Sequence, residues 1–426
     1  MKILLINNFY YNRGGDCTYL FSLKELLEKK GHTVSVFSMH HPLNFDNEYS
    51  KYFVDYINYD DEVKDINIAS GTKVLKRTIF SLEAREKIER LLKEEKPDIA
   101  HLQNIHHHIT PSIFFAFKKY KIPVVWTLHD YSIICPNTSF LSHGRICEKC
   151  KKRKYFWPPI EKCKKESFSA STMAGLEAVS HYVAGVSQLV NMFIAPSEFL
   201  RGKCIEYGIK EENIKCLHYF IDKRFPPGTG ENSDYFLYAG RLSREKGVKT
   251  LIDATLKVSL NGKDANILKK YKLKIVGAGP LHEELVSYAR SKDKNNIIEF
   301  LGHKRHEEVI DLIRGCRFTV VPSEWYENYP FAIMESFICG KPVIGTKFGG
   351  IPELITNTVR GLIFKHGNSD DLCATIKYLL NNPDLAEEMG RNARTFALEE
   401  LNGEKHYEKL MEIYEFVMHK NRTHST

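Results

Sequence analysis

No run of about 18 apolar residues occurs in the 426-residue sequence, so the sequence predicts no transmembrane helix. The amino terminus also lacks a secretory signal, because its short apolar stretch is better explained by a buried strand. There is no low-complexity tract and no internal repeat of about 20 to 50 residues. The composition, 43% hydrophobic and 27% charged, is typical of a soluble globular chain. We therefore expect a cytoplasmic protein of two domains, because one core rarely extends over so many residues.

Acidic residues are scarce in one stretch, residues 145–165, which contains nine Lys and Arg but only two Asp and Glu. This stretch therefore contributes +7 to the formal net charge of the chain, which is +8. A protein that binds nucleic acid usually spreads its cations over a whole face. The local excess instead predicts one anionic partner surface and no nucleic-acid partner.

Disulfides are not expected among the ten cysteines, because the cytoplasm keeps thiols reduced. Four cysteines fall in an insert over residues 135–165 with the spacing C-x11-C-x2-C-x12-C: Cys135, Cys147, Cys150 and Cys163. Four thiolates with one C-x2-C element suit a tetrahedral structural zinc site. The spacing differs from that of a zinc ribbon, in which both halves are C-x2-C, so four reduced thiols in a loop remain the alternative.

Aromatic side chains accompany the cations of this insert. Residues 151–159 read K-K-R-K-Y-F-W-P-P. Cations beside tyrosine, phenylalanine and tryptophan suit the headgroup region of an anionic bilayer. The segment predicts peripheral attachment to the inner face of the plasma membrane, and a solvated basic loop is the alternative.

The start of the chain has the pattern of a doubly wound α/β domain. A strand over residues 2–7 is followed by a loop and then by a helix over residues 17–31, in which apolar residues recur at helical spacing. Gly14 and Gly15 lie in the loop. Backbone N–H groups and the helix dipole at such a position favour an anionic ligand.

Histidines follow two further predicted strands of this half. His129 and Asp130 come directly after a β-rich stretch over residues 123–128, at the carboxyl edge where parallel sheets bind ligands. Three consecutive histidines, residues 106–108, follow a strand over residues 98–102. Adjacent side chains point in different directions, so these three cannot all bind one metal ion.

The second half places cations and carboxylates at the ends of predicted strands. Arg241 and Lys246 lie between a strand over residues 235–239 and the next helix. Arg binds phosphate through two parallel hydrogen bonds and Lys adds a mobile point charge, so the pair suits a diphosphate. Glu327 and Glu335 follow another buried strand, the first on a loop and the second on a helix.

A nicotinamide site is excluded for this half. Residues 277–280 read G-A-G-P after a strand, but His282 stands where the dinucleotide fingerprint requires a third glycine. No acidic residue about 20 positions further on stands in the strand-end context that the fingerprint requires.

The motifs of the second half occur in a fixed order. Residues 238–247 read Y-A-G-R-L-S-R-E-K-G, residues 321–335 read V-P-S-E-W-Y-E-N-Y-P-F-A-I-M-E, and residues 349–353 read G-G-I-P-E. Together they resemble the donor site of the family 4 glycosyltransferases. These have the GT-B fold, an α/β architecture of two Rossmann-like doubly wound domains facing across a cleft. The resemblance covers most of the chain and is strongest over residues 235–385.

The resemblance implies a domain plan and a reaction. Residues 1–225 would form the acceptor-side domain and residues 226–400 the nucleotide-sugar-binding domain, and a helix over residues 401–426 would cross back to the first domain. The reaction would transfer sugar with retention at the anomeric carbon and without a catalytic metal or other cofactor. The donor would be a UDP- or GDP-sugar.

The resemblance also implies residue roles. Arg241 and Lys246 would stabilise the leaving diphosphate, Glu327 would hold the sugar, and His129 would turn its ring toward that sugar. Glu335 would bind the ribose. The residues implied to bind substrate are Gly14, Gly15, Asp130, Tyr329, Pro330, Phe331, Glu335, Gly302, His303 and Lys304.

The expected function is a retaining glycosyltransferase that acts on a saccharide or lipid-linked saccharide in bacterial surface polysaccharide or glycolipid assembly. Two alternatives stay open. A GT-B sugar-nucleotide epimerase would use the same site but would act without an acceptor. A non-catalytic, metal-dependent protein would bind lipid or nucleic acid through the insert. The intact Arg241, Lys246, Glu327 and Glu335 argue against the second alternative.

Overall fold

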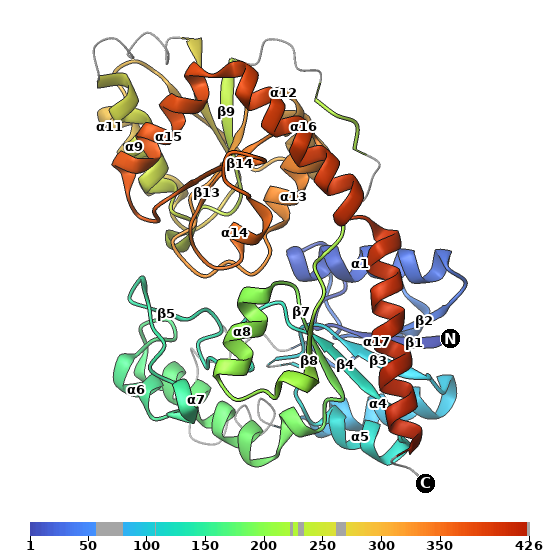
Figure 1. The fold of residues 1–426 in the computed structure, drawn as a ribbon. Coiled ribbons are helices and arrows are strands. Elements are labelled where there is room, and N and C mark those ends of the chain that lie inside the picture. Colours follow the sequence, from blue (N-terminus) through green and yellow to red (C-terminus); the bar gives the residue numbers. More distant parts are fainter. Residues whose placement is uncertain (57–79, 107, 222–224, 229–233, 261–269, 424–426) are drawn as a thin grey trace. The chain divides into compact units, whose positions relative to one another are not determined.

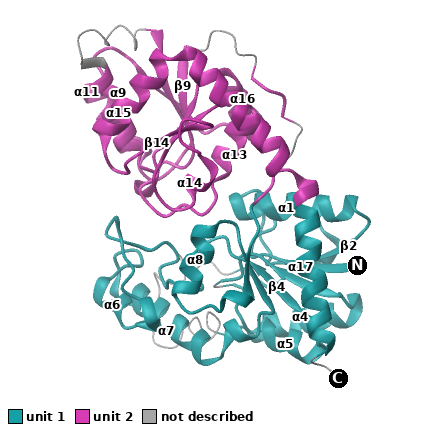
Figure 2. Cartoon of the chain, in the orientation of Figure 1, with its two compact units in different colours: residues 1–218, 406–426 teal, residues 219–405 magenta. Residues whose placement is uncertain are grey.

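The computed structural model describes residues 1–56, 80–106, 108–221, 225–228, 234–260 and 270–423. The chain divides into two compact units (Figure 2). Unit 1 comprises Met1–His218 and His406–Thr426, and unit 2 comprises Tyr219–Lys405. The predicted domain boundary, between residues 225 and 226, directly follows residues 222–225, of which 222–224 lie outside the described residues, and the two units divide slightly earlier, between His218 and Tyr219.

Unit 1 is built on a sheet of six parallel strands (Figure 1). The strands are β1 (Lys2–Ile6), β2 (Thr33–Phe37), β3 (Ile99–Leu102), β4 (Val124–Thr127), β7 (Met192–Ala195) and β8 (Ile214–Cys216). Their order is β2-β1-β3-β4-β7-β8. Because the order reverses between β1 and β3, the carboxyl ends of these strands flank the crevice where such sheets bind ligands.

Helices connect the strands of unit 1 in the doubly wound pattern that the sequence predicts. α1 begins directly after its N-cap, Gly14, and buries Tyr19, Leu20 and Leu23. The side chain of Ser81 caps α4 by accepting a hydrogen bond from the backbone N–H of Ala84. The bounds are α1 (Gly15–Lys29), η1 (Glu48–Tyr52), α4 (Leu82–Glu95), α5 (Ile113–Tyr120), α8 (Glu198–Glu206) and η4 (Glu211–Asn213).

The connection from β4 to β7 is long and contains the cysteine-bearing insert. Its elements are β5 (Leu141–Ser142), β6 (Arg145–Ile146), η2 (Lys151–Arg153), α6 (Trp157–Glu161), α7 (Phe168–Val183) and η3 (Val186–Gln188). β5 and β6 pair as a short antiparallel hairpin, and α6 packs against α7. The crossover between these two parallel strands is therefore a small subdomain rather than a single helix.

Unit 2 also has a sheet of six parallel strands. The strands are β9 (Tyr235–Ala239), β10 (Lys272–Val276), β11 (Ile298–Gly302), β12 (Thr319–Val321), β13 (Val343–Thr346) and β14 (Gly361–Phe364). Their order, β11-β10-β9-β12-β13-β14, is the 3-2-1-4-5-6 order of dinucleotide-binding folds. The order reverses between β9 and β12, so the ligand crevice is expected at the carboxyl ends of these two strands.

Capping residues of the usual types mark the ends of helices in unit 2. Gly340, in the left-handed conformation (φ 72°), stops α13 at its C-cap, Cys339. The side chain of Asn368 caps α15. The bounds are η5 (Arg244–Lys246), α9 (Val248–Leu260), α11 (His282–Lys292), α12 (His306–Gly315), α13 (Phe331–Ile338), α14 (Ile351–Leu354), α15 (Ser369–Asn381) and α16 (Pro383–Glu400).

The last helix, α17 (Gly403–Thr423), belongs to unit 1 from His406 onward. Two buried histidine–tyrosine pairs hold it. His101 Nδ1 lies 2.6 Å from Tyr414 Oη, and His406 Nε2 lies 3.0 Å from Tyr19 Oη. None of the helices in the described ranges combines the length and the hydrophobicity that crossing a bilayer requires.

Candidate functional site

The switch point of unit 2 brings together two of the predicted catalytic residues. Lys246 lies at the end of η5, in the connection that follows β9, and Glu327 lies in the loop that follows β12. Lys246 Nζ donates a hydrogen bond of 2.7 Å to Glu327 Oε1, although the residues are 81 positions apart. Their pairing follows from the topology, because β9 and β12 are neighbours in the sheet.

Two glycines allow the loops around this pair to pack closely. Gly247 adopts the left-handed conformation (φ 66°), and a Cβ atom there would lie 2.0 Å from the carbonyl oxygen of Pro322. Gly349 also has a positive φ (62°), and its Cβ would lie 2.5 Å from the carbonyl oxygen of Glu327. The next residue, Gly350, donates its backbone N–H to that oxygen at 2.7 Å. The G-G-I-P-E motif thus holds the backbone of Glu327 in place.

The Glu327 carboxylate is charged although it is only 6% exposed. Burial raises its pKa, but Lys246, the Ser323 hydroxyl and Trp325 together outweigh this effect, so the pKa lies below its usual range. Ser323 Oγ donates a hydrogen bond of 2.7 Å to the same oxygen, Oε1. Lys246 Nζ also lies 5.1 Å from the centre of the Trp325 ring. A preorganised ammonium–carboxylate pair therefore lies at the carboxyl edge of the sheet.

Arg241 and Glu335 are not part of this pair. Arg241 is exposed directly after β9, and its backbone carbonyl accepts a hydrogen bond of 2.7 Å from Tyr238 Oη. Glu335, on α13, lies 2.9 Å from Nε2 of His306, the first residue of α12. This contact raises the pKa of His306 more than burial lowers it. Sequence reasoning missed His306, because the contact depends on the packing of α12 against α13.

The remaining residues predicted to bind the donor lie on two further loops of unit 2. Tyr329 is 3% exposed, and the Phe331 ring stacks on Tyr219 with 5.1 Å between ring centres. Pro330 is the N-cap of α13, which begins at Phe331. Gly302 ends β11, and His303 and Lys304 follow it.

The switch region of unit 1 brings the glycine loop near His129. Gly14 is the N-cap of α1 and Gly15 its first residue. Asp16, in the first turn, is close enough to raise the pKa of His129, but burial dominates and holds that pKa at about 4. The imidazole is therefore neutral near pH 7. His129 Nε2 lies 2.6 Å from Gln103 Oε1, at the end of β3.

Asp130 has a local role in the structure. Its Oδ1 accepts a hydrogen bond of 2.8 Å from the backbone N–H of Ser132 and so closes a turn. Gln103, which was not predicted, contacts the His129 ring nitrogen. The signal that could have found it is its place directly after β3, beside β4, the strand that precedes His129.

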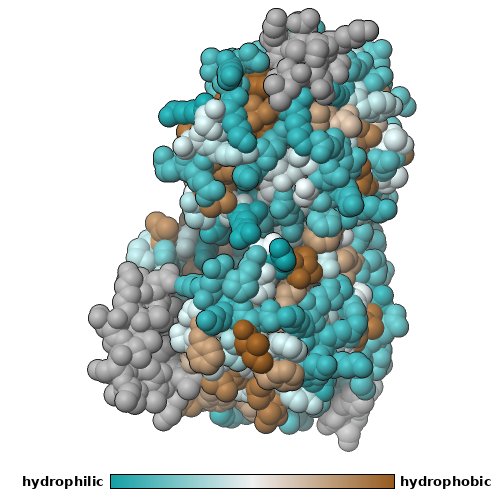
Figure 3. All heavy atoms as spheres, turned by 90° about the vertical axis from the view of Figure 1, so that its left-hand side faces the viewer, coloured by the Kyte–Doolittle hydropathy of each residue, from teal (hydrophilic) through white to brown (hydrophobic). Residues whose placement is uncertain are grey.

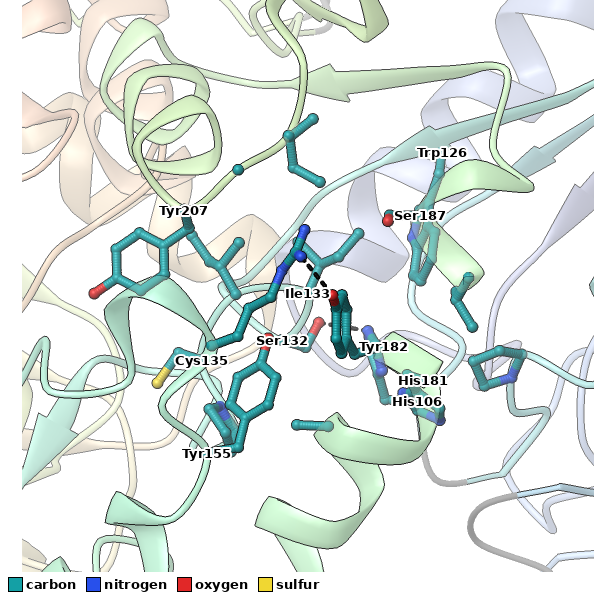
Figure 4. Close-up of a pocket in the computed structure, with 18 residues that line it drawn as sticks. His106, Trp126, Ser132, Ile133, Cys135, Tyr155, His181, Tyr182, Ser187 and Tyr207 are labelled. Carbon is teal, nitrogen blue, oxygen red and sulfur yellow. Dashed lines mark hydrogen bonds between the residues drawn. The ribbon is translucent and has the colours of Figure 1, made fainter. Parts of the chain in front are cut away.

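A cavity in unit 1 is lined in part by α7 (Figure 4). His106, Ser132, Arg153 and Tyr182 are among its lining residues, and Figure 4 shows how His106, Ser132 and Tyr182 lie around it. His106 Nε2 is hydrogen-bonded to Ser132 Oγ, and Arg153 Nη1 donates a hydrogen bond of 2.7 Å to Tyr182 Oη. Of the other histidines in the predicted triplet, His107 lies outside the described residues.

The four insert cysteines come near one another, and all four are free thiols. Burial raises the pKa of Cys135 to about 11 and also raises those of Cys150 and Cys163, and each is raised further by neighbouring cysteines of the group. Within the described residues, however, no three His, Cys, Asp or Glu side chains are arranged so that they could hold a metal ion as they stand. The donor set suits zinc, but the sulfurs are not in a coordinating arrangement.

Solved structures with the same fold define the class of the protein. The chain is similar to sucrose-phosphate synthase of Thermosynechococcus elongatus, with a TM-score of 0.70 at 16% identity over 98% of this chain and 99% of that chain. It is also similar to Anabaena HepE in complex with UDP-glucose, with a TM-score of 0.63 at 18% identity over 97% and 99% of the two chains. The expected GT-B fold, with two Rossmann-like domains, is confirmed.

Sequence comparisons give the family. The family model for Glycosyltransferase Family 4 matches residues 13–225, and the model for Glycosyl transferases group 1 matches residues 220–396. The chain belongs to glycosyltransferase family 4, and it is a transferase, as the sequence motifs predicted.

Two relatives illustrate how far the similarity extends. An uncharacterized glycosyltransferase of Methanocaldococcus jannaschii is 30% identical over 221 residues, which are 50% of this chain and 58% of that protein. An uncharacterized 42.6 kDa protein in the cps region of Klebsiella pneumoniae is 26% identical over 370 residues, which are 83% of this chain and 87% of that protein.

Proposed function

We propose that the protein transfers a sugar from a nucleotide-sugar donor to an acceptor hydroxyl, with retention at the anomeric carbon. The observation that carries this proposal is the Lys246–Glu327 pair at the switch point of unit 2. The fold places ligands at such a point, and the pair offers a cation for a diphosphate and a carboxylate for sugar hydroxyls. The complexes of Anabaena HepE with UDP and UDP-glucose support a donor of this kind.

In the proposed mechanism, Arg241 and Lys246 stabilise the negative charge that develops on the departing diphosphate. Preorganised charges of this kind are commonly the largest catalytic contribution. Glu327 and the backbone near Tyr329 hold the sugar, and Glu335 binds the ribose. The leaving phosphate takes the acceptor proton, so the mechanism requires no metal ion and no separate general base.

The donor contacts require side-chain rearrangement. Lys246 must exchange part of its contact with Glu327 for contact with phosphate, and ribose must replace His306 at the Glu335 carboxylate. Both pairs are accessible to such exchange, since the side chains of Lys246 and His306 are 25% and 53% exposed. Backbone groups of residues 302–304 contact the base.

The acceptor contacts are assigned to unit 1. Gly14 and Gly15 present backbone N–H groups at the start of α1, where an anionic or hydroxylated ligand is favoured. His129 is neutral near pH 7 and directs its ring toward the reacting sugar, and Gln103 fixes that ring. Asp130 contacts an acceptor hydroxyl.

The acceptor is proposed to be a saccharide, free or lipid-linked, in bacterial surface polysaccharide or glycolipid assembly. The similarity to a protein encoded in the cps region of Klebsiella pneumoniae supports this setting. The setting would place the enzyme in the cytoplasm and at the inner face of the plasma membrane.

Attachment to an anionic membrane through the insert is part of the proposal. Phe156, Ile160, Phe168 and Val183 are 57%, 62%, 61% and 78% exposed, and they lie on α6, on α7 and just before α6. Figure 3, which looks at the side of the molecule where α6 and α7 lie in Figure 1, shows hydrophobic side chains scattered among hydrophilic ones on that face. Exposed apolar side chains flanked by cations suit the membrane interface.

A structural zinc ion at Cys135, Cys147, Cys150 and Cys163 is also proposed. In the thiol state each group disfavours ionisation of the others, and a bound dication would reverse this by stabilising the thiolates. Elemental analysis of protein purified without chelator should give about one zinc per chain. Cys147→Ser should lose the metal, whereas Cys204→Ser, on α8 and outside the group, should keep it. If the purified protein contains no metal and its thiols are reduced, the four cysteines are ordinary loop thiols and do not form a zinc site.

The experiment that tests the reaction is a panel of UDP- and GDP-sugars read by nucleotide release, with and without lipid-linked acceptors. Acceptor-dependent release with one donor is expected. Conversion of the donor sugar without any acceptor would instead identify an epimerase. Absence of release with every donor, together with lipid or nucleic-acid binding, would indicate the non-catalytic alternative. Proton NMR of the product's anomeric signal tests retention.

A further inference from the structure

A cationic cavity lies in unit 2. Its walls come from residues 227–228, from the turn between α13 and β13, and from α16. Four cations line it, namely Arg317, Lys341, Arg391 and Arg394. Among the described residues of the lining, Glu387 is the only carboxylate. The lining therefore carries an excess of positive charge.

The cavity is at the opposite edge of the sheet from the Lys246–Glu327 pair. Arg317 comes just before β12 and Lys341 just before β13, so both lie at the amino ends of parallel strands. Lys246 and Glu327 follow the carboxyl ends of β9 and β12. The cavity is thus separate from the proposed donor site.

Lys341 is the most unusual residue of the lining, because it is only 8% exposed. Its backbone N–H donates to Ser336 O, but within the described part of the chain its ammonium group has neither a hydrogen bond nor an ion pair. Burial is the main reason that its pKa is lowered. Lysines are almost never buried without a partner, because an unpaired buried charge is costly.

The ammonium group of Lys341 lies against another residue of the lining. A methyl group on Gly228, which lines the cavity, would lie 2.9 Å from Nζ of Lys341. An anion in the cavity would supply the partner that the described residues do not provide.

Of the arginines around Lys341, two can still pair with an anion, and the third is held in place by backbone carbonyl groups. The Arg317 guanidinium lies 5.2 Å from the centre of the Tyr271 ring, and Arg391 is exposed. Within the described ranges neither forms an ion pair with a carboxylate. Arg394 is held at the wall because its Nη1 donates to the carbonyl oxygens of Phe225, at 3.3 Å, and Ile338. Guanidinium groups match the geometry of phosphate, which accepts two parallel hydrogen bonds.

We infer that this cavity binds a small phosphorylated molecule, whose phosphoryl group pairs with Lys341 and with the neighbouring arginines. Four cations against one carboxylate suit a dianionic group. The inference goes beyond the proposed transfer reaction and does not depend on it, because none of these residues belongs to the donor or acceptor assignments.

Thermal unfolding of the full-length protein in increasing inorganic phosphate, at an ionic strength held constant with sodium chloride, tests the inference. The Tm of the wild-type protein should rise with phosphate, because a ligand that binds the native state stabilises it. Lys341→Met should unfold at a higher temperature than wild type without phosphate, since the unpaired buried charge is gone. The Tm of Lys341→Met should rise little when phosphate is added.

Arg391→Gln provides a variant whose exposed side chain is not needed for folding. Its phosphate affinity should fall about tenfold, the usual effect of losing one charge-assisted hydrogen bond. Arg290→Gln, which changes an exposed arginine on α11, is the matched control and should respond as wild type does. Lys246→Ala shows whether any of the phosphate-dependent rise in Tm comes from phosphate binding at the proposed donor site. Equal phosphate responses in wild type, Lys341→Met and Arg391→Gln, or a response that only Lys246→Ala removes, would overturn the inference.

Discussion

The connection from the fourth to the fifth strand differs between the two units, although both sheets have six parallel strands. In unit 2 it runs from β12 to β13 and contains one helix, α13, of 8 residues. In unit 1 it runs from β4 to β7 and contains the hairpin, α6 and α7. Both connections start at the carboxyl edge, where parallel sheets bind ligands.

The short connection is closely constrained, and the long one is not. Gly247 and Gly349 pack closely against the loop that carries Glu327, so that loop has little room to move past its neighbours. The long connection exposes many of its apolar side chains to solvent. Seven of the 15 exposed large apolar side chains in the described residues lie between residues 156 and 183. The framework of unit 2 therefore holds the loop that carries Glu327, whereas the insert of unit 1 is a small subdomain added at the surface.

The largest expected difference between the units is in their response to acid. Burial lowers the pKa of His101 to about 3 and those of His129 and His406 to about 4, all in unit 1. In unit 2, contact with Glu335 raises the pKa of His306. A histidine with a lowered folded pKa contributes stability that is present above its unfolded pKa, about 6.5, and is lost as the pH falls toward 4. Each unit of pKa shift corresponds to about 1.4 kcal/mol.

Calorimetry between pH 7.5 and pH 4.5 should therefore show unit 1 losing several kcal/mol of stability while unit 2 changes less. Hydrogen exchange should place the first opening at α17, because His101 and His406 anchor that helix. His406→Gln should weaken this pH dependence, and His419→Gln, which changes an exposed histidine of the same helix, should not. Equal acid sensitivity in the two units would contradict the comparison.

The next largest effect is expected at the donor site. Lys246→Ala should lower turnover by about two orders of magnitude, or about 3 kcal/mol, because one preorganised positive charge is lost. Arg241→Ala should have a similar effect, because the proposed mechanism places Arg241 at the same diphosphate. Turnover measured with the donor found in the panel checks both.

Arg244→Ala is the matched control for this prediction. Arg244 lies in the same short turn, η5, but is exposed and has no assigned role. Circular dichroism and Tm should confirm that each variant is folded. Unchanged turnover in folded Lys246→Ala protein would remove the donor assignment.

The elements of the site could be predicted from the sequence where short motifs determine geometry. The strand before Arg241, the helix that carries Glu335 and the turn at Gly349 follow from local signals, and Lys246 meets Glu327 because parallel strands share an edge. The fold could be predicted because apolar runs alternate with helical patterns.

The contacts that were missed depend on packing between distant segments. His306 reaches Glu335 through the packing of α12 on α13, and Gln103 reaches His129 across β3 and β4. No periodicity or spacing in the sequence encodes the first contact, and only the place of Gln103 directly after a strand points to the second. The buried Lys341 was also missed, because nothing in G-K-P indicates that this lysine lies inside a cavity.

The structure also reduces the number of cations that the insert can offer to a membrane. Lys151 pairs with Glu206, and Arg153 donates to Tyr182 and stacks on its ring. Lys152, Lys154 and Lys162 are exposed. The insert therefore offers fewer free cations than its sequence contains. The proposed attachment depends correspondingly more on the exposed apolar side chains of α6 and α7.

The smallest expected effect per residue is on membrane binding, which co-sedimentation with vesicles at low and high salt measures. Each cation near an anionic surface contributes about 1 kcal/mol, and the attraction fades over a Debye length of about 8 Å at physiological salt. Replacing Lys152, Lys154 and Lys162 by Gln should therefore weaken binding to anionic vesicles at low salt but change little at high salt. Replacing Lys118 and Lys121, exposed lysines on and just after α5, serves as the matched control. Equal binding to neutral and anionic vesicles, or none to either, would mean that the insert is a solvated loop and that the acceptor is reached in solution.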